Sequence, residues 1–177
     1  NVFVEAHACQ YGGGVEHFAH TRTAFRSFIS DYYNITIDYF IGKGIISMGA
    51  NVFEGCTANH MTINFNFPGH SFNIENAMHW FKGLHCPDIT FGDDVTSIGD
   101  FTLSRADVRY ITICDNVEYI GQGAFAQCLE LETITMGRGL KTIDKHALFE
   151  CSKLHNVTLN EGLETIEAYA FNSCTAL

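Results

Sequence analysis

The residues of this chain with the most obvious capacity for chemistry are its nine histidines and seven cysteines. They come closest together at His7–Cys9, at His17–His20 and at His85–Cys86. A closed zinc site needs three or four such side chains converging on one ion, and none of these spacings matches a known arrangement. The sequence therefore predicts scattered surface histidines, with no metal and no cofactor.

A cysteine beside a histidine could also form a nucleophile and its base, and the candidate is Cys151 with His146 or His155. However, Cys151 belongs to a column of cysteines at a fixed interval. Such a column predicts a buried thiol, and burial disfavours the reactive thiolate. The sequence lacks the nucleophile elbow, the phosphate-binding P-loop and the H-E-x-x-H zinc motif. We therefore predict that the chain is not an enzyme.

The cysteine column is one of several that repeat every 23 residues. The columns are Leu131, Leu154 and Leu177; Cys128, Cys151 and Cys174; Ile120, Ile143 and Ile166; and Phe125, Leu148 and Phe171. An internal period of this length is the signature of a solenoid, in which each unit stacks on the next. Because parallel columns point their Cβ atoms in one direction, the column, which also includes Cys56, predicts buried thiols rather than disulfides.

The repeat becomes less regular toward the N-terminus. A degenerate unit runs from 63 to 84. Its alanine, phenylalanine, cysteine and leucine columns are taken by Ala77, Met78, Phe81 and Leu84. Two extra residues then follow, around His85 and Cys86. We predict a single domain, with degenerate repeats or a cap over residues 1–34 and stacked repeats over residues 35–177 that are incomplete at the C-terminus.

Each unit contains two short extended pieces and one segment of helical spacing. In the clearest unit, Ile134 and Met136 alternate with polar residues, as in a half-buried strand. Leu140 and Ile143 follow after a glycine-containing turn, and the spacing of apolar residues over 147–151 predicts one helical turn. Stacked units pair their strands about 4.8 Å apart. This predicts a repeat solenoid with short parallel β-strands on its concave face and short helical or extended segments on the other side.

The unit reads L-x-x-I-x-L-x-x-x-L-x-x-I-x-x-x-A-F-x-x-C-x-x over roughly residues 35–177. This pattern resembles the BspA-type, or treponemal, class of leucine-rich repeat. It lacks the asparagine ladder of the commoner leucine-rich repeat, since the comparable positions hold Asn116, Gly139 and Gly162. The resemblance implies a surface, secreted or periplasmic protein of bacteria or protozoa, in a family linked to adhesion and host interaction. It supplies no shared catalytic residues.

The outward positions of the first strand of each unit are the main candidates for binding. They are Thr62, Asn64, Asp88, Thr90, Tyr110, Thr112, Thr133, Thr135, Asn156 and Thr158. Solenoids commonly bind partners on their concave sheet, and an exposed aromatic residue often anchors an interface, so Tyr110 is the expected anchor. The alternative is structural, because threonine suits any half-exposed strand.

An irregular stretch rich in aromatic residues is the second candidate. Its members are Phe65, Phe67, Phe72, His79, Trp80 and Phe81. An exposed aromatic cluster would mark an interaction or self-association face. A locally repacked core accounts for the same residues equally well, and the sequence leaves both interpretations open.

The charge of the chain restricts its partners. The formal net charge of −10 repels phosphate, which disfavours nucleic acid and anionic membranes. The longest uncharged run, 55–74, contains asparagine, histidine and Pro68, so it does not predict a membrane span. The resemblance to the BspA-type repeats implies a surface or secreted adhesin-like protein that binds a host matrix or cell-surface protein. The alternative is a self-assembling module that forms homo-oligomers.

Overall fold

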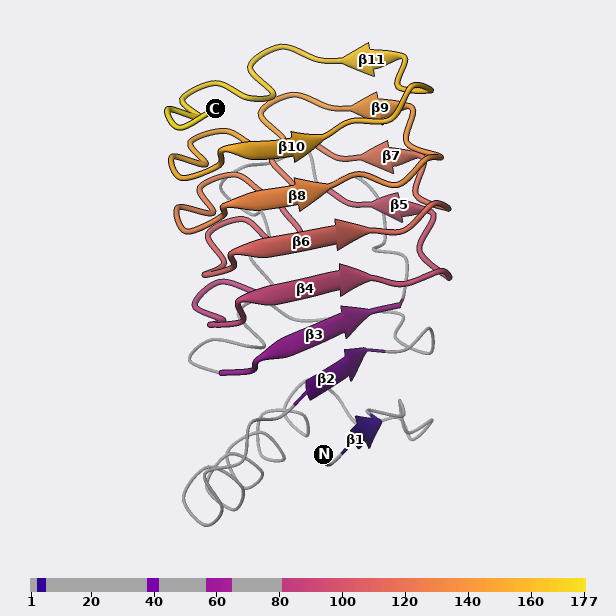
Figure 1. The fold of residues 1–177 in the computed structure, drawn as a ribbon, viewed down its shortest axis with the longest axis vertical. Helices are drawn as coiled ribbons and strands as arrows, with labels where there is room; N and C mark the ends of the chain where they lie inside the picture. Colours follow the sequence, from indigo (N-terminus) through magenta and orange to yellow (C-terminus); the bar gives the residue numbers. More distant parts are fainter. Residues whose placement is uncertain (1–2, 6–37, 42–56, 65–80) are drawn as a thin grey trace.

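The computed structural model describes residues 3–5, 38–41, 57–64 and 81–177, with side chains described for 57–64 and 81–177. The described parts of the chain stack as successive coils along one long axis, from residues 38–41 toward one end to residues 165–166 at the other (Figure 1). Each of the later coils contributes one strand to each of two parallel sheets. The predicted repeat solenoid with short parallel strands is confirmed.

Within the described residues, one sheet has seven strands and the other has four. The seven-stranded sheet consists, in spatial order, of β1 (Phe3–Glu5), β2 (Asp38–Ile41), β3 (His60–Ile63), β4 (Asp88–Phe91), β6 (Tyr110–Ile113), β8 (Thr133–Thr135) and β10 (Asn156–Thr158). The four-stranded sheet consists of β5 (Ser97–Ile98), β7 (Tyr119–Ile120), β9 (Thr142–Ile143) and β11 (Thr165–Ile166). The strands of the two sheets run in opposite directions across the coil (Figure 1).

Alternating polarity explains the strands. In β4 the side chains of Ile89 and Phe91 are buried, whereas those of Asp88 and Thr90 are partly exposed. The same alternation recurs in β3 and β6, because successive side chains of a strand point to opposite faces. One face of each sheet therefore lines the interior, and the other face meets solvent.

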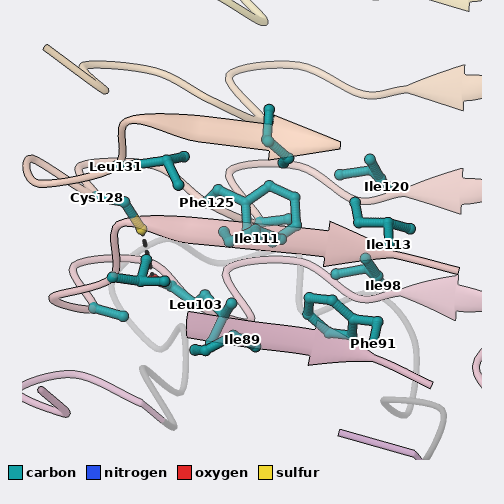
Figure 2. Packing of buried hydrophobic residues seen from close by; sticks show 14 of the residues in the cluster. Ile89, Phe91, Ile98, Leu103, Ile111, Ile113, Ile120, Phe125, Cys128 and Leu131 are labelled. Atoms are coloured by element: carbon teal, nitrogen blue, oxygen red, sulfur yellow. Dashed lines mark hydrogen bonds between the residues drawn. The ribbon is translucent and has the colours of Figure 1, made fainter. Parts of the chain in front are cut away.

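The interior is a set of apolar columns, one residue per coil. Figure 2 shows side chains from the two sheets and from the turn region meeting in one core. Ile89, Ile111 and Ile134 form one column at 0–1% exposure, while Phe91 packs edge-on against Phe125 with ring centroids 6.1 Å apart. Each such side chain contributes about 1.5–3 kcal/mol by leaving water. The repeated leucines, isoleucines and phenylalanines of the sequence are thus the residues that hold neighbouring coils together.

The predicted helical turn over the A-F-x-x-C stretch is wrong, and the described residues contain no helix. Here the backbone N–H groups alternate between two kinds of partner. The N–H of Ala126 binds the Gly123 carbonyl three residues earlier, whereas the N–H of Gln127 donates to the Phe149 carbonyl of the next coil. Gly123 and Gln127 adopt left-handed φ angles of 60° and 61°. Bonds between coils thus replace the i to i−4 bonds of a helix.

The predicted alignment of the degenerate unit is also wrong. Asp88 pairs with His60, 28 residues earlier, while His85 bridges Asp107, 22 residues later. That register places Leu84 in the cysteine column and Cys86 in the leucine column, with Phe81 in the phenylalanine column. The extra residues therefore precede Phe81 instead of following Leu84. Two further predicted column members, at 77 and 78, lie outside the described residues.

Candidate functional site

The outer face of the seven-stranded sheet carries two columns of side chains. The first column contains His60, Asp88, Tyr110, Thr133 and Asn156, and the second contains Thr62, Thr90, Thr112, Thr135 and Thr158. We call these the first column and the second column, and together they form the outer face. Successive side chains of a strand point to opposite faces, and the neighbouring strands stay in register. All of the predicted binding residues except Asn64 therefore lie together on the outer face.

The register of β3 corrects two assignments. Thr62 pairs with Thr90, not with the Asp88 column in which the sequence alignment had placed it. Asn64 follows the strand, where its side-chain amide donates to Asp94 Oδ2 at 2.6 Å. His60 takes the position in the first column that sequence reasoning missed. The available signal was the parallel between His60-Met-Thr-Ile and Asp88-Ile-Thr-Phe, in which threonine is the third residue of each strand.

His60 links two coils on the outer face. Its Nδ1 lies 3.0 Å from Asp88 Oδ2, and its Nε2 lies 3.0 Å from Thr62 Oγ1. The side chains of His60 and Asp88 are 34% and 47% exposed. The pair is therefore open to solvent, and it is an ion pair only when the imidazole is protonated.

Tyr110 is the large exposed side chain of the outer face, at 44% exposure, as its predicted role as an anchor requires. Its hydroxyl donates to Glu132 Oε2 at 3.3 Å. The other carboxylate oxygen of Glu132 lies 3.9 Å from Arg109 Nε. The ring is thus held at its phenol end, while nearly half of the residue stays exposed.

The second predicted candidate, the aromatic patch, fails at Phe81. That ring is 0% exposed and belongs to the core, so it cannot contribute to a surface cluster. The other members, Phe65, Phe67, Phe72, His79 and Trp80, lie outside the described residues.

The predicted ladder of thiols is present at Cys128, Cys151 and Cys174, all of which are free. Each thiol donates to a backbone carbonyl of the preceding coil, as Cys128 does to Leu103 at 3.1 Å (Figure 2). Burial raises the pKa of Cys128 to about 12. The fourth predicted member, Cys56, lies outside the described residues.

The arrangement around Cys151 does not support a nucleophile. The neighbouring Cys174 thiol, together with burial, raises the pKa of Cys151, which disfavours its thiolate. His146 stacks on Tyr169 with ring centroids 5.2 Å apart, and His155 contacts the Lys153 carbonyl at 3.0 Å. Neither imidazole is positioned by a hydrogen bond to the thiol in the described part of the chain.

Two wider features also concern the residues that the structure describes. Over 57–64 and 81–177, no three histidine, cysteine or carboxylate side chains converge in a way that could hold a metal ion. The described segments include no helix with the length and apolarity needed to cross a membrane.

Comparisons with known proteins agree with this architecture. The crystal structure of a leucine-rich repeat protein from Bacteroides ovatus ATCC 8483 superposes with a TM-score of 0.50 at 18% sequence identity. The match covers 79% of this chain and 47% of that protein, so the chain spans about half the length of its structural neighbour. At this identity the likeness establishes the fold alone. No curated protein matches the sequence.

The sequence itself matches one family. Six copies of the BspA-type leucine-rich repeat region cover residues 74–177, which is more than half of the chain. These residues include the strands from β4 to β11 and the whole thiol ladder described above. The chain therefore belongs to the BspA-type leucine-rich repeat family.

Proposed function

We propose that this chain is the protein-binding module of an adhesin-like surface protein, and that it binds its partner with the outer face of the seven-stranded sheet. Leucine-rich repeat domains generally bind proteins, and BspA-type repeats are often found in surface-exposed bacterial proteins. The partner in this proposal is a host matrix or cell-surface protein.

The observation that carries the proposal is the difference between the inner and outer residues of the same strands. The inward column of the same five strands stays apolar, as Met61, Ile89, Ile111, Ile134 and Val157, because each residue packs between coils. The first column of the outer face changes at every described strand, from histidine to aspartate, tyrosine, threonine and asparagine. Packing does not impose these outward choices, so they are available to specify a partner.

The constant second column has a structural explanation. Threonine is β-branched and suits a half-exposed position on a strand, and its repetition at Thr90, Thr112 and Thr135 needs no ligand. Specificity in this proposal therefore comes from the first column, with Tyr110 as its anchor because it combines an exposed ring with a fixed position.

The test is a binding screen of the purified chain against immobilised extracellular-matrix proteins and intact host cells. We expect saturable binding that the double variant Tyr110→Ala, Thr112→Glu abolishes. The matched control Tyr169→Ala, Thr142→Glu makes the same changes away from the outer face, at an exposed tyrosine and at a threonine of β9. Equal loss in both variants, or binding that neither variant changes, would show that the outer face is not the site.

The same material distinguishes the alternative function, self-assembly. A self-assembling module would show a mass above 19.7 kDa that increases with concentration and is insensitive to the outer-face variant. Sedimentation equilibrium of the wild-type chain and of both double variants measures this directly. A monomer that binds a matrix protein supports the adhesin-like function, whereas an oligomer that binds only itself supports assembly.

A further inference from the structure

Three consecutive strands of the outer face place one aromatic ring between two carboxylates. Tyr110 of β6 pairs in register with Asp88 of β4, so the two side chains stand side by side on one face. On the other side, the Tyr110 hydroxyl donates to Glu132, which immediately precedes β8. The ring therefore has an acidic group toward each neighbouring coil.

Both carboxylates keep some capacity to accept hydrogen bonds. Asp88 uses Oδ2 for His60, while its Oδ1 has no hydrogen-bond partner among the described residues. Glu132 uses Oε2 for Tyr110, and its Oε1 lies 3.9 Å from Arg109, beyond hydrogen-bond distance. Their side chains are 47% and 29% exposed, so an incoming donor can reach both.

We propose that Tyr110, Asp88 and Glu132 form a subsite for an arginine side chain of the protein partner. The face of an aromatic ring carries negative potential and attracts a cation. A guanidinium is planar, so it can stack on the ring and still direct its N–H groups to carboxylates at the edge. Adjacent strands are about 4.8 Å apart, a separation that lets one guanidinium contact the ring and a carboxylate together.

Charge complementarity favours a cationic occupant over an anionic or neutral one. The chain has a formal charge of −10, and the two acids of the subsite face His60 and Arg109 as their nearby basic groups. His60 neutralises Asp88 only when it is protonated, whereas Arg109, which is 53% exposed, forms an ion pair with Glu132 at 3.9 Å. This inference rests on the proposed function, since it names the chemistry that the outer face recognises.

The test uses a short capped peptide of alternating glycine and arginine, titrated into the intact chain at low ionic strength and followed by NMR. A peptide with citrulline in place of arginine has nearly the same shape but no charge. We expect the arginine peptide to shift the resonances of β4, β6 and β8, and the citrulline peptide to leave them unchanged. Equal binding of both peptides would overturn the inference.

Variants locate the subsite. Tyr110→Ala and Asp88→Asn should each weaken the arginine peptide about two- to fivefold, which is the range for exposed cation–π contacts and ion pairs. Tyr110→Phe keeps the ring and should bind within about twofold of the wild type. The control Glu164→Gln removes one exposed charge beside the four-stranded sheet and should have little effect, because salt screens distant charges. If Glu164→Gln weakens binding as much as Asp88→Asn, the attraction is diffuse and the subsite does not exist.

Failure of this inference and failure of the proposed function give different results. If a matrix protein binds through Tyr110 but the arginine peptide does not bind, the outer face is a binding site with another chemistry. If the arginine peptide binds at Tyr110 while no matrix protein does, the subsite is present and the adhesin-like function is wrong. Circular dichroism of every variant confirms that each compared chain is folded.

Discussion

Replacing Gly139 by alanine should strongly destabilise the solenoid, because its coils touch at this turn. A Cβ at Gly139 would lie 2.2 Å from the carbonyl oxygen of Asp115 in the preceding coil, far inside ordinary contact distance. The obstacle is backbone and not a flexible side chain, so the two coils must separate to relieve it. Overpacking lowers the free energy of unfolding by about 1–3 kcal/mol, and we expect a loss of about 3 kcal/mol for Gly139→Ala. For a chain of this size that lowers Tm by about 6–12 °C.

The chain supplies a matched control one repeat later. Gly162 has the same position in its coil, but a Cβ there would lie 3.7 Å from the Arg138 carbonyl oxygen, which is ordinary van der Waals contact. Gly162→Ala should therefore change the free energy of unfolding by less than about 0.5 kcal/mol. Urea titrations followed by far-ultraviolet circular dichroism measure both variants. If the two alanine variants are equally stable, close approach of coils does not determine this turn and the steric reasoning fails.

Two further predictions concern the interior. Phe81→Ala should lower the free energy of unfolding by about 3–5 kcal/mol, because it empties a fully buried position. Tyr110→Ala should lower it by less than about 0.5 kcal/mol. Equal losses of stability in thermal melts would contradict the assignment of Phe81 to the core. Because folding raises the pKa of Cys128 from 9.0 to about 12, the thiol's stabilising contribution is present below pH 9 and is lost as the pH rises toward 12. At about pH 10.5 the wild type should have lost about 2 kcal/mol relative to Cys128→Ala, at about 1.4 kcal/mol per pH unit; parallel stability curves for the two proteins would refute the buried-thiol account.

The repeat period alone was enough to predict the core, because each inward residue packs against its counterpart in the next coil. Ile134 and Ile143 are buried as the columns predict. The helical turn failed because apolar residues at 147, 148 and 151 fit a helix and a run of turns equally well. The equivalent turn one coil earlier shows why turns form instead. There the N–H of Gln127 donates to the Phe149 carbonyl of the next coil, and Gln127 is held at a φ angle of 61°. A polar residue in a left-handed conformation leaves no signal in a single sequence.

The register of β3 could not be obtained from the pattern of apolar residues, since the unit that contains it has extra residues. Phe81 and Leu84 are both apolar, so each fits either of two neighbouring columns when the insertion is misplaced. The pairing of His60 with Asp88 and the bridge between His85 and Asp107 decide between the two alignments. His60 was missed as an outer-face residue for this reason: Thr62 was assigned to the first column in its place, and Asn64 was assigned to the second column.

The ion pair at Asp88 can be compared with the ion pairs on the other surfaces of the coils. On other surfaces, Glu118 pairs with Lys141 at 3.0 Å and Glu130 with Lys153 at 2.6 Å, each one repeat away, whereas Asp107 pairs with His85. Such exposed pairs add little stability, about 0–1 kcal/mol each, but they neutralise the surface locally. Asp88 is paired with His60, and this contact is an ion pair only when the imidazole is protonated. Among the described residues, the Asp88 carboxylate beside Tyr110 therefore has no lysine or arginine partner, and a cationic side chain of a binding partner can take that place.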